Sequence, residues 1–286
     1  MKVAFAGLGV MGFPMAGHLA KAGHEVSVFN RSPEKAARWA ETFGGRAGAT
    51  AAEAAAGVEV FVLCVGKDDD VRQVVSQALP VMAPGGIVVD HTTTSAVVAR
   101  EMADLAAQSG RAFVDAPVSG GQAGAEAGQL TIMCGGQPEA FARVEPVIAA
   151  YAKASRLMGA SGSGQLAKMV NQICIAGVVQ GLAEAMHFAK RAGLDTQAVY
   201  EAVSKGAAQS WQMDNRWKTM AENRFDFGFA VDWMRKDLGL VLDEAGRNGA
   251  ALDMTRMVDG FYAEVQALGG QRWDTSSLVA RLEKPE

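Results

Sequence analysis

The sequence contains few cysteines and histidines, which argues against a metal centre or a disulfide framework. Only three cysteines and four histidines occur among 286 residues. The cysteines lie far apart in apolar runs, without metal-ligand or Cys-x-x-Cys spacing, so we expect Cys64, Cys134 and Cys174 to be buried and unpaired. The four histidines, His18, His24, His91 and His187, are scattered along the chain and form no His/Asp/Glu/Cys cluster with ligand spacing. We therefore predict no metal site.

The sequence also lacks an excess of positive charge. Its 27 Lys and Arg residues are outnumbered by 31 Asp and Glu residues, and the net charge is −4 at pH 7 with a pI near 5.7. Nucleic acids and anionic membrane surfaces are bound by basic faces, so we expect neither partner. A hydrophobic content of 49% is enough to bury one large core or two smaller ones.

Long hydrophobic runs are missing as well. No run reaches the ~18 apolar residues that a membrane span needs. Residues 1–6, which are apolar apart from Lys2, are followed by Gly7, Gly9 and Gly12, which interrupt the segment before the hydrophobic region of a signal peptide could form. These two absences predict a cytoplasmic protein.

The first half of the chain alternates short β-rich runs with helical patterns. Between these runs lie helical patterns at residues 11–22, at 33–43 behind Ser32, and at 47–57 with a capping-box start at Thr50 and Glu53. Alternating strands and helices predict a parallel sheet with helices on both faces. The predicted strands are residues 2–6, 25–29, 58–65, 87–90, 111–115 and 130–134.

The pattern changes after about residue 164. Residues 165–192 are mostly apolar, interrupted only by Gly177 and Gly181, and as a helix they would extend about 40 Å. Such a helix suits a domain connector or a dimer core, and from residue 196 onward the periodicity is helical. We predict an α/β Rossmann-type domain over residues 1–162 and an all-α domain over 163–286, with a long interdomain helix. We also expect a homodimer or homotetramer.

A glycine-rich turn follows the first predicted strand and opens a helix. Its sequence is Gly7-Leu8-Gly9-Val10-Met11-Gly12, the G-x-G-x-x-G pattern of dinucleotide-binding turns in the context that the pattern requires. Gly7 permits the tight turn, Gly9 lets the backbone approach a pyrophosphate, and Gly12 permits close packing of helix on strand. The phosphates would lie on the helix N–H groups. A glycine turn without a ligand is the weaker interpretation.

The end of the second predicted strand distinguishes the two dinucleotides. NAD-binding proteins usually carry Asp or Glu there, bonded to the ribose 2′-hydroxyl. This sequence carries Asn30-Arg31-Ser32, with no carboxylate to repel a 2′-phosphate and with an Arg31 guanidinium that can pair with it. The alternative is that Arg31 is a solvated surface charge. We predict NADP(H) as the cofactor, with NAD(H) less favoured.

Three further segments carry polar groups suited to chemistry. Ser119-Gly120-Gly121 offers a hydroxyl and backbone N–H groups that can hold a carboxylate, although an ordinary glycine-rich loop is equally consistent with this segment alone. Lys168 and Asn171 are three residues apart in the long apolar helix and share one face. A lysine in such a run either is enclosed, as a proton donor would be, or reaches out to water. Lys236-Asp237 alone is an ordinary ion pair.

Together these segments resemble the β-hydroxyacid dehydrogenases. That family includes 3-hydroxyisobutyrate dehydrogenase, tartronate semialdehyde (2-hydroxy-3-oxopropionate) reductase and the glyoxylate/succinic semialdehyde reductases. The resemblance covers nearly the whole chain, because four motifs occur in the right order and spacing. The motifs are residues 7–15, 115–121, 162–172 and 236–238.

The resemblance implies roles for individual residues. Lys168 is the expected general acid and base, Ser119 with Gly120 and Gly121 the loop for the substrate carboxylate, and Asn171 the amide that orients the substrate. Lys236, supported by Asp237, is expected near the nicotinamide ribose and the substrate. The remaining cofactor contacts would come from Val65, after the third of the predicted strands, and from Thr93 in the segment Asp90-His91-Thr92-Thr93.

The family therefore implies NADP(H)-dependent reduction of a short semialdehyde or keto acid to a hydroxy acid, or the reverse reaction. The substrate would be a small aldehyde, ketone or hydroxy acid that carries a carboxylate. Three departures leave the particular substrate open: Cys64-Val65-Gly66-Lys67 after the third strand, Ala96 where proline is common, and Asp232-Trp233 where apolar residues are usual. An imine reductase is disfavoured by Lys168. A non-catalytic NADP-binding scaffold is disfavoured by Lys168 and the Ser119 loop together.

Overall fold

A computed structural model of the chain describes residues 1–283, which form two compact units. The first unit is Met1–Lys168, and the second begins at Met169. Each unit is described by itself below. The domain boundary expected between residues 162 and 163 stays a prediction.

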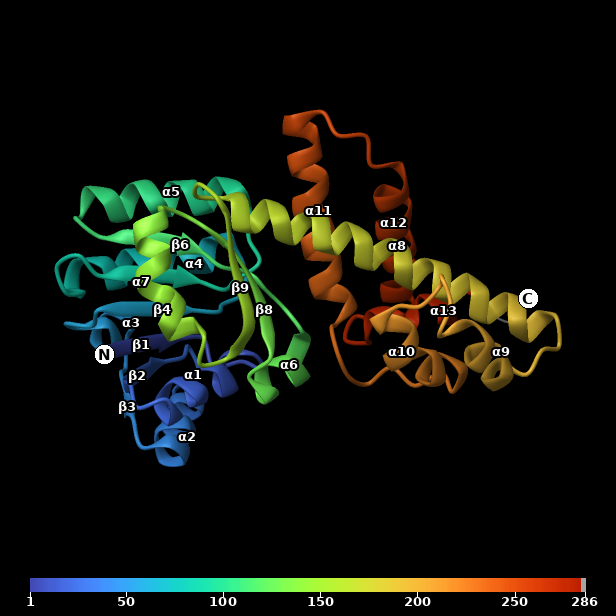
Figure 1. Cartoon of the computed structure of the whole chain (residues 1–286), viewed down its shortest axis with the longest axis horizontal. Coiled ribbons are helices and arrows are strands. Elements are labelled where there is room, and N and C mark those ends of the chain that lie inside the picture. Colours follow the sequence, from blue (N-terminus) through green and yellow to red (C-terminus); the bar gives the residue numbers. More distant parts are fainter. Residues whose placement is uncertain (284–286) are drawn as a thin grey trace. The chain divides into compact units, whose positions relative to one another are not determined.

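The first unit is built on a single nine-stranded sheet (Figure 1). Its strand order is β3-β2-β1-β4-β5-β6-β8-β7, with β9 paired to β8. The strands from β3 to β6 in this order are all parallel. The bounds are β1 (Lys2–Ala6), β2 (Glu25–Phe29), β3 (Arg46–Ala47), β4 (Val60–Leu63), β5 (Ile87–Asp90), β6 (Ala112–Asp115), β7 (Val118–Ser119), β8 (Leu130–Gly135) and β9 (Ala152–Gly159).

Helices cover both faces of this sheet, so its central strands are buried on both sides (Figure 1). Successive residues of β1 alternate between two cores: Val3 and Phe5 pack in one, with Trp39, and Ala4 and Ala6 pack in the other. The parallel, doubly covered sheet is the expected Rossmann-type architecture. The helices are α1 (Gly12–Lys21), α2 (Pro33–Phe43), α3 (Ala51–Ala55), α4 (Asp68–Ala78), α5 (Ala96–Gln108), α6 (Gly121–Ala127) and α7 (Pro138–Ile148).

Local sequence signals define several of these helix starts. The Thr50 side chain accepts a hydrogen bond from the N–H of Glu53 and caps α3, as the capping-box pattern predicts. Pro33 begins α2 as expected, but Ser32 makes no side-chain capping bond there. The predicted helical stretch 47–57 is shorter than expected, because Ala47 belongs to β3.

The prediction of a parallel sheet holds only in part for residues 130–134. They form a strand, β8, which pairs parallel with β9 but antiparallel with β6 and β7. A parallel connection needs a crossover of a dozen or more residues, usually with a helix. β7 follows β6 after only two residues, and residues 120–129, which connect β7 to β8, are fewer than such a crossover needs. Strands β3, β7 and β9 were not predicted because they are short or half-exposed and lack an apolar run.

The second unit is helical, and the long helix α8 (Ser163–Arg191) runs into it from the end of the first unit. In residues 169–283 the only strand-like pairing is an isolated bridge between Ala230 and Asp274. The core of this unit is built around Trp217, Tyr262 and Leu278. The other helices are α9 (Thr196–Val203), α10 (Trp211–Ala221), α11 (Val231–Asn248), α12 (Asp253–Ala267) and α13 (Leu278–Leu282), and two short 3₁₀ turns are Leu79–Val81 and Thr275–Ser277.

Helix α8 is long and apolar enough to cross a membrane by length and composition, which was not expected from the sequence. Core helices pass the same test, and 44% of its most apolar window is buried, so the absence of a membrane partner stays a prediction.

The cysteines agree with expectation only in part. Cys134 is buried as expected, but Cys64 is only partly buried and Cys174, on α8, is exposed. Because α8 is apolar on most of its surface, its sequence does not reveal which side faces the core.

Candidate active site

The glycine turn after β1 shows which of its glycines the fold itself needs. Gly7 has a φ of +93°, and a Cβ added to it would collide with the carbonyl oxygen of Cys64. A Cβ on Gly12 would collide with the carbonyl oxygen of Gly7. A Cβ on Gly9 would meet no atom within 4 Å. The fold therefore explains the first and third glycines, whereas the second keeps open a space beside the start of α1.

The end of β2 is tied directly to this turn. The Asn30 side chain accepts a hydrogen bond from the Leu8 N–H at 2.8 Å and donates one to the Ser32 carbonyl at 3.1 Å. The Arg31 side chain is 91% exposed, and its Nη1 lies 3.8 Å from Oδ1 of Asp70. Residues 30–32 contain no carboxylate, as noted from the sequence, but the fold brings Asp70 of α4 to Arg31. Sequence reasoning missed this neighbour because it lies 39 residues away.

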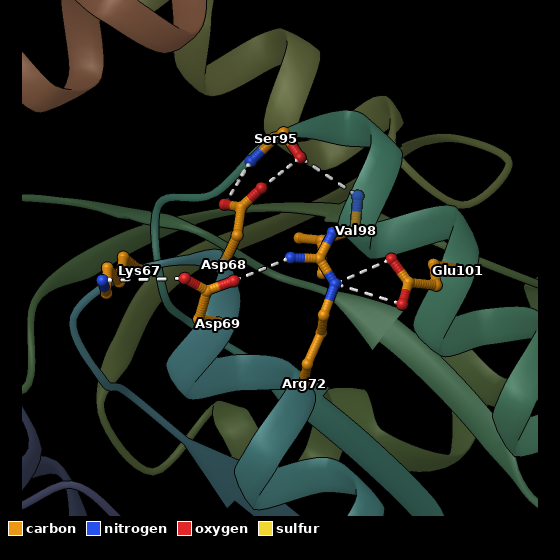
Figure 2. A network of polar contacts seen from close by, with 7 residues as sticks. All are labelled: Lys67, Asp68, Asp69, Arg72, Ser95, Val98 and Glu101. Atoms are coloured by element: carbon orange, nitrogen blue, oxygen red, sulfur yellow. Dashed lines mark hydrogen bonds and ion pairs between the residues drawn. The ribbon is translucent and has the colours of Figure 1, made fainter.

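The segments that follow β4 and β5 hold each other in place. The Val65 N–H donates to the Thr92 hydroxyl at 3.0 Å, and the Thr92 N–H donates to Asp90 at 2.9 Å. Asp68, at the start of α4, accepts hydrogen bonds from both the N–H and the hydroxyl of Ser95 (Figure 2). Val65 and Thr93 therefore lie in two interlocked loops at the carboxyl edge of the parallel strands, where ligands of such sheets bind.

Charged side chains fasten the helices that follow these loops. Arg72 of α4 donates to both carboxylate oxygens of Glu101 in α5, at 3.1 and 2.9 Å, and also to Asp69 at 3.1 Å (Figure 2). Lys67 lies 3.6 Å from Asp69. All four side chains are solvent-exposed, so each pair contributes little free energy, and together they join α4 to α5.

Two buried carboxyl groups lie at the ends of adjacent strands. Burial raises the pKa of Asp90 to about 7, against the opposing effect of hydrogen bonds from Thr92. Burial also raises the pKa of Asp115 to about 6, opposed by backbone N–H groups that include those of Gly162 and Gln165. From the sequence both residues were recognised only as motif members. The sequence signal that could have identified them is a single acidic residue at the end of an apolar strand.

A buried histidine lies beside them. The Nδ1 of His91 is 2.6 Å from the Ala116 carbonyl, which can only accept, so Nδ1 carries the proton. Its Nε2 is 2.8 Å from the Tyr151 hydroxyl and accepts from it. Burial lowers the pKa of His91 to about 4, so the ring is neutral near pH 7. The sequence predicted no metal role for His91. Within residues 1–283 no cluster of three metal-ligating side chains occurs.

The start of α8 carries the candidate lysine. Lys168 is buried, with 7% of its surface exposed, so it does not extend into water as the alternative interpretation required. The helix begins where Gly162 and Gln165 donate to the carboxylate of Asp115, at 2.8 and 3.0 Å. Lys168 follows Gln165 by three residues and shares its face of the helix.

In the second unit, three of the expected site residues are brought together through Gln172. Asn171 donates to Gln172 at 2.8 Å, and Gln172 donates to Asp237 at 2.7 Å. Asp237 in turn lies 3.2 Å from Nζ of Lys236, which also stands 5.8 Å from the ring centre of Trp233. Gln172 is fully buried, and sequence reasoning assigned it no role.

The remaining residues singled out in the sequence lie at the turn from β7 into α6 and at the start of α11. Ser119 is half-buried in β7, and Gly120 and Gly121 are exposed, with φ values of +132° and +60°, at the turn into α6. Asp232, whose role was left open, accepts a hydrogen bond from Gln266 of α12 at 2.6 Å. Asp232 thus packs the start of α11 against α12.

Comparisons with known proteins agree with this architecture. Residues 2–173 match the NAD-binding domain of 6-phosphogluconate dehydrogenase, and residues 162–282 match the NAD-binding family of NADP-dependent 3-hydroxyisobutyrate dehydrogenase. An uncharacterized oxidoreductase of Shewanella frigidimarina is 62% identical, over 99% of this chain and 98% of that protein. The 2-hydroxy-3-oxopropionate reductase of Escherichia coli is 33% identical, over 99% of this chain and 97% of that protein.

Solved structures give the same result. A structure of 3-hydroxyisobutyrate dehydrogenase from Mycobacterium tuberculosis with L-serine superposes with a TM-score of 0.90 at 32% identity, covering 99% of both chains. The chain belongs to the β-hydroxyacid dehydrogenase family. The protein is therefore an oxidoreductase that uses a nicotinamide dinucleotide.

The glycine turn fits such a cofactor. The open space at Gly9 allows a pyrophosphate to approach the backbone of the turn, whereas the Phe13 and Met15 N–H groups of α1 already donate to the Gly9 and Met11 carbonyls. No side chain caps the start of α1. The residues that would hold the pyrophosphate are therefore those of the turn itself, Gly7 to Gly12.

The glycine geometry predicts opposite outcomes for two single substitutions. Gly9→Ala should leave the melting temperature within about 2 °C of wild type, because its Cβ meets nothing, while weakening NADPH binding at least tenfold. Gly7→Ala should lower the melting temperature, because its Cβ collides with backbone and its φ is unfavourable for alanine. Thermal melts and fluorescence titration of NADPH measure both. Unchanged NADPH affinity in Gly9→Ala would contradict the assignment of the turn.

Proposed function

We propose that this protein is an NADP(H)-dependent oxidoreductase that interconverts a short, carboxylate-bearing semialdehyde or keto acid and the hydroxy acid. The observation that carries the proposal is the burial of Lys168 at the start of α8, in the segment that matches the family's catalytic motif. The Escherichia coli relative is named for reduction of a small oxo acid, which supports this class of substrate.

Lys168 is the proposed general acid in the direction of reduction. When bound, the nicotinamide supplies the hydride to the carbonyl carbon. The Lys168 ammonium polarises the carbonyl oxygen and gives it a proton as the negative charge develops; in oxidation the neutral amine takes the hydroxyl proton. A lysine enclosed by the protein interacts with this developing charge more strongly than a solvated one, because the surroundings are less polar than water.

Further residues have proposed roles in holding the substrate. The Ser119 hydroxyl and the N–H groups of Gly120 and Gly121 bind the carboxylate. Asn171 orients the reacting oxygen, and its amide is held by Gln172. Lys236, paired with Asp237, supplies positive charge near the nicotinamide ribose and the substrate. We propose Gly7 to Gly12, Val65 and Thr93 as the remaining cofactor contacts.

The preference for NADP(H) is proposed on the residues after β2. Arg31 is exposed and carries the charge that can pair with a 2′-phosphate, and Asn30 and Ser32 are neutral. Asp70, 3.8 Å from Arg31, competes for the same guanidinium.

A homo-oligomer is proposed on the outer side of α8. Exposed apolar and small residues follow one another along it at spacings of three or four, and Phe188 is 71% exposed. This outer α8 stripe consists of Val170, Cys174, Val178, Gly181, Ala185 and Phe188. A continuous apolar stripe of this length is typical of a surface that another subunit covers.

The first test replaces Lys168 with methionine, which keeps the length of the side chain and removes its proton. We expect kcat to fall by a factor on the order of 10²–10⁴, the usual contribution of a general acid, while the dissociation constant of NADPH changes less than threefold. NADPH oxidation is measured with glyoxylate, succinic semialdehyde, methylmalonate semialdehyde and tartronate semialdehyde. Turnover near wild type in Lys168→Met would sink the assignment, and no turnover of any of the four by wild type would reject the substrate class.

The second test concerns the cofactor preference. Arg31→Ala should weaken NADPH binding about tenfold or more and leave NADH binding within twofold, because only NADPH carries the 2′-phosphate. Asp70→Asn should strengthen NADPH binding a few-fold, since it removes the competing carboxylate. Fluorescence titrations at two salt concentrations give both values. Equal losses for NADPH and NADH in Arg31→Ala would show that Arg31 does not discriminate.

The third test concerns assembly. Phe188→Glu places a charge in the outer α8 stripe and should shift the protein to a smaller species in sedimentation velocity. Leu268→Glu, at an exposed apolar residue just after α12, is the matched control and should leave the sedimentation coefficient unchanged. A wild-type protein that sediments as a monomer at micromolar concentration would refute the proposed homo-oligomer.

A further inference from the structure

The first turn of α8 receives its capping interactions from a distant strand. A helix leaves its first N–H groups without partners inside the helix. At α8 they are accepted by the carboxylate of Asp115, which ends β6: Oδ1 bonds to the Gly162 N–H at 2.8 Å and Oδ2 bonds to the Gln165 N–H at 3.0 Å. Asp115 is 47 and 50 residues from its two partners. The start of α8 is thus fixed to the sheet by a charge at the favourable end of the helix dipole.

Two glycines enclose this carboxylate and leave it little freedom. A Cβ on Gly135 in β8 would stand 2.7 Å from both Asp115 carboxylate oxygens. A Cβ on Gly164 in α8 would stand 2.8 Å from Oδ2 and 2.7 Å from the Asp115 carbonyl oxygen. Helix and strand therefore approach as closely as only glycine permits. These contacts leave no room for a side chain between the start of α8 and strands β6 and β8.

The Gln165 side chain makes a second connection, to the loop after β5. It is fully buried; its Oε1 accepts from the Thr94 N–H at 3.0 Å and its Nε2 donates to the Thr92 carbonyl at 2.8 Å. The amide thus pairs with the backbone of residues 92–94 as a neighbouring strand would. Thr92 also receives the Val65 N–H, so the same loop is tied to the segment after β4.

We propose that Asp115 and Gln165 are positioning residues that hold Lys168 at a fixed distance from the loop of residues 92–94. Gln165 and Lys168 lie on one face of the same helix, one turn apart. Fixing the Gln165 side chain therefore also fixes the backbone position from which the Lys168 side chain extends. This inference rests on the proposed role of Lys168. It goes beyond that role by naming the groups that set the position of the lysine and by connecting that position to the loop that carries Thr93.

The test removes both hydrogen bonds of the Gln165 side chain with Gln165→Met, which keeps its length. We expect kcat to fall tenfold or more, since a misplacement of about 1 Å can cost a hundredfold, while the KM of the aldehyde changes less than threefold. Independently of turnover, labelling of Lys168 by trinitrobenzenesulfonate, followed by peptide mass spectrometry, should become at least fivefold faster. Gln165→Asn, with the same amide on a shorter stem, should give the same direction of change.

Gln180→Met is the matched control. Gln180 is also a buried glutamine of α8, but its amide bonds only to Glu184, one turn further along the same helix. We expect wild-type kcat and wild-type labelling of Lys168 in this variant, with a comparable change in melting temperature. The inference is overturned if Gln165→Met matches Gln180→Met in both kcat and labelling. If wild type turns over none of the four aldehydes, the proposed function fails, while faster labelling in Gln165→Met would still support the positioning role and unchanged labelling would refute it.

Discussion

The hydrogen bonds between the Asp115 carboxylate and the start of α8 are the interaction on which the rest of the site depends. An ionised group in a protein interior is costly unless hydrogen bonds compensate it. Here burial raises its pKa to about 6, and the N–H groups of α8 offset part of that cost. The same bonds supply the partners that the start of the helix needs. Burial of the Asp115 carboxylate would otherwise destabilise the sheet. Through these hydrogen bonds it instead fixes where α8, the helix that carries Lys168, begins.

Two buried glutamines, Gln165 and Gln172, extend this order along α8 because each uses both ends of its amide. A carboxylate such as Asp237, beside the Lys236 ammonium, accepts hydrogen bonds, so Gln172 turns its Nε2 to Asp237 and its Oε1 to Asn171. The Asn171 Nδ2 is consequently committed to Gln172, which fixes the rotation of the Asn171 amide. Gln165 is oriented in the same way by one carbonyl and one N–H. Amides fixed at both ends confer the rigidity that substrate positioning requires.

Local patterns predicted much of the fold, and long-range pairing explains what they missed. The bounds of β1 and β2, the cap at Thr50 and the length of α8 follow from short stretches of sequence. The antiparallel pairing of β8 with β6 and β7 does not, because it depends on how short the β7–β8 connection is. The exposure of Cys174 depends on which side of an apolar helix is covered. Lys168 was predicted as a site residue, whereas Gln165 was not, because its partners lie more than 70 residues away.

The glycine turn and the residues after β2 separate what the fold requires from what a ligand requires. Steric contacts within the protein account for Gly7 and Gly12 but leave Gly9 unexplained, so Gly9 carries the functional information. Asn30 is informative for a different reason. An aspartate could also accept the Leu8 N–H, but it could not donate to the Ser32 carbonyl as the Asn30 amide does. The amide therefore does more than remove a negative charge: it closes the backbone turn that presents the exposed guanidinium of Arg31.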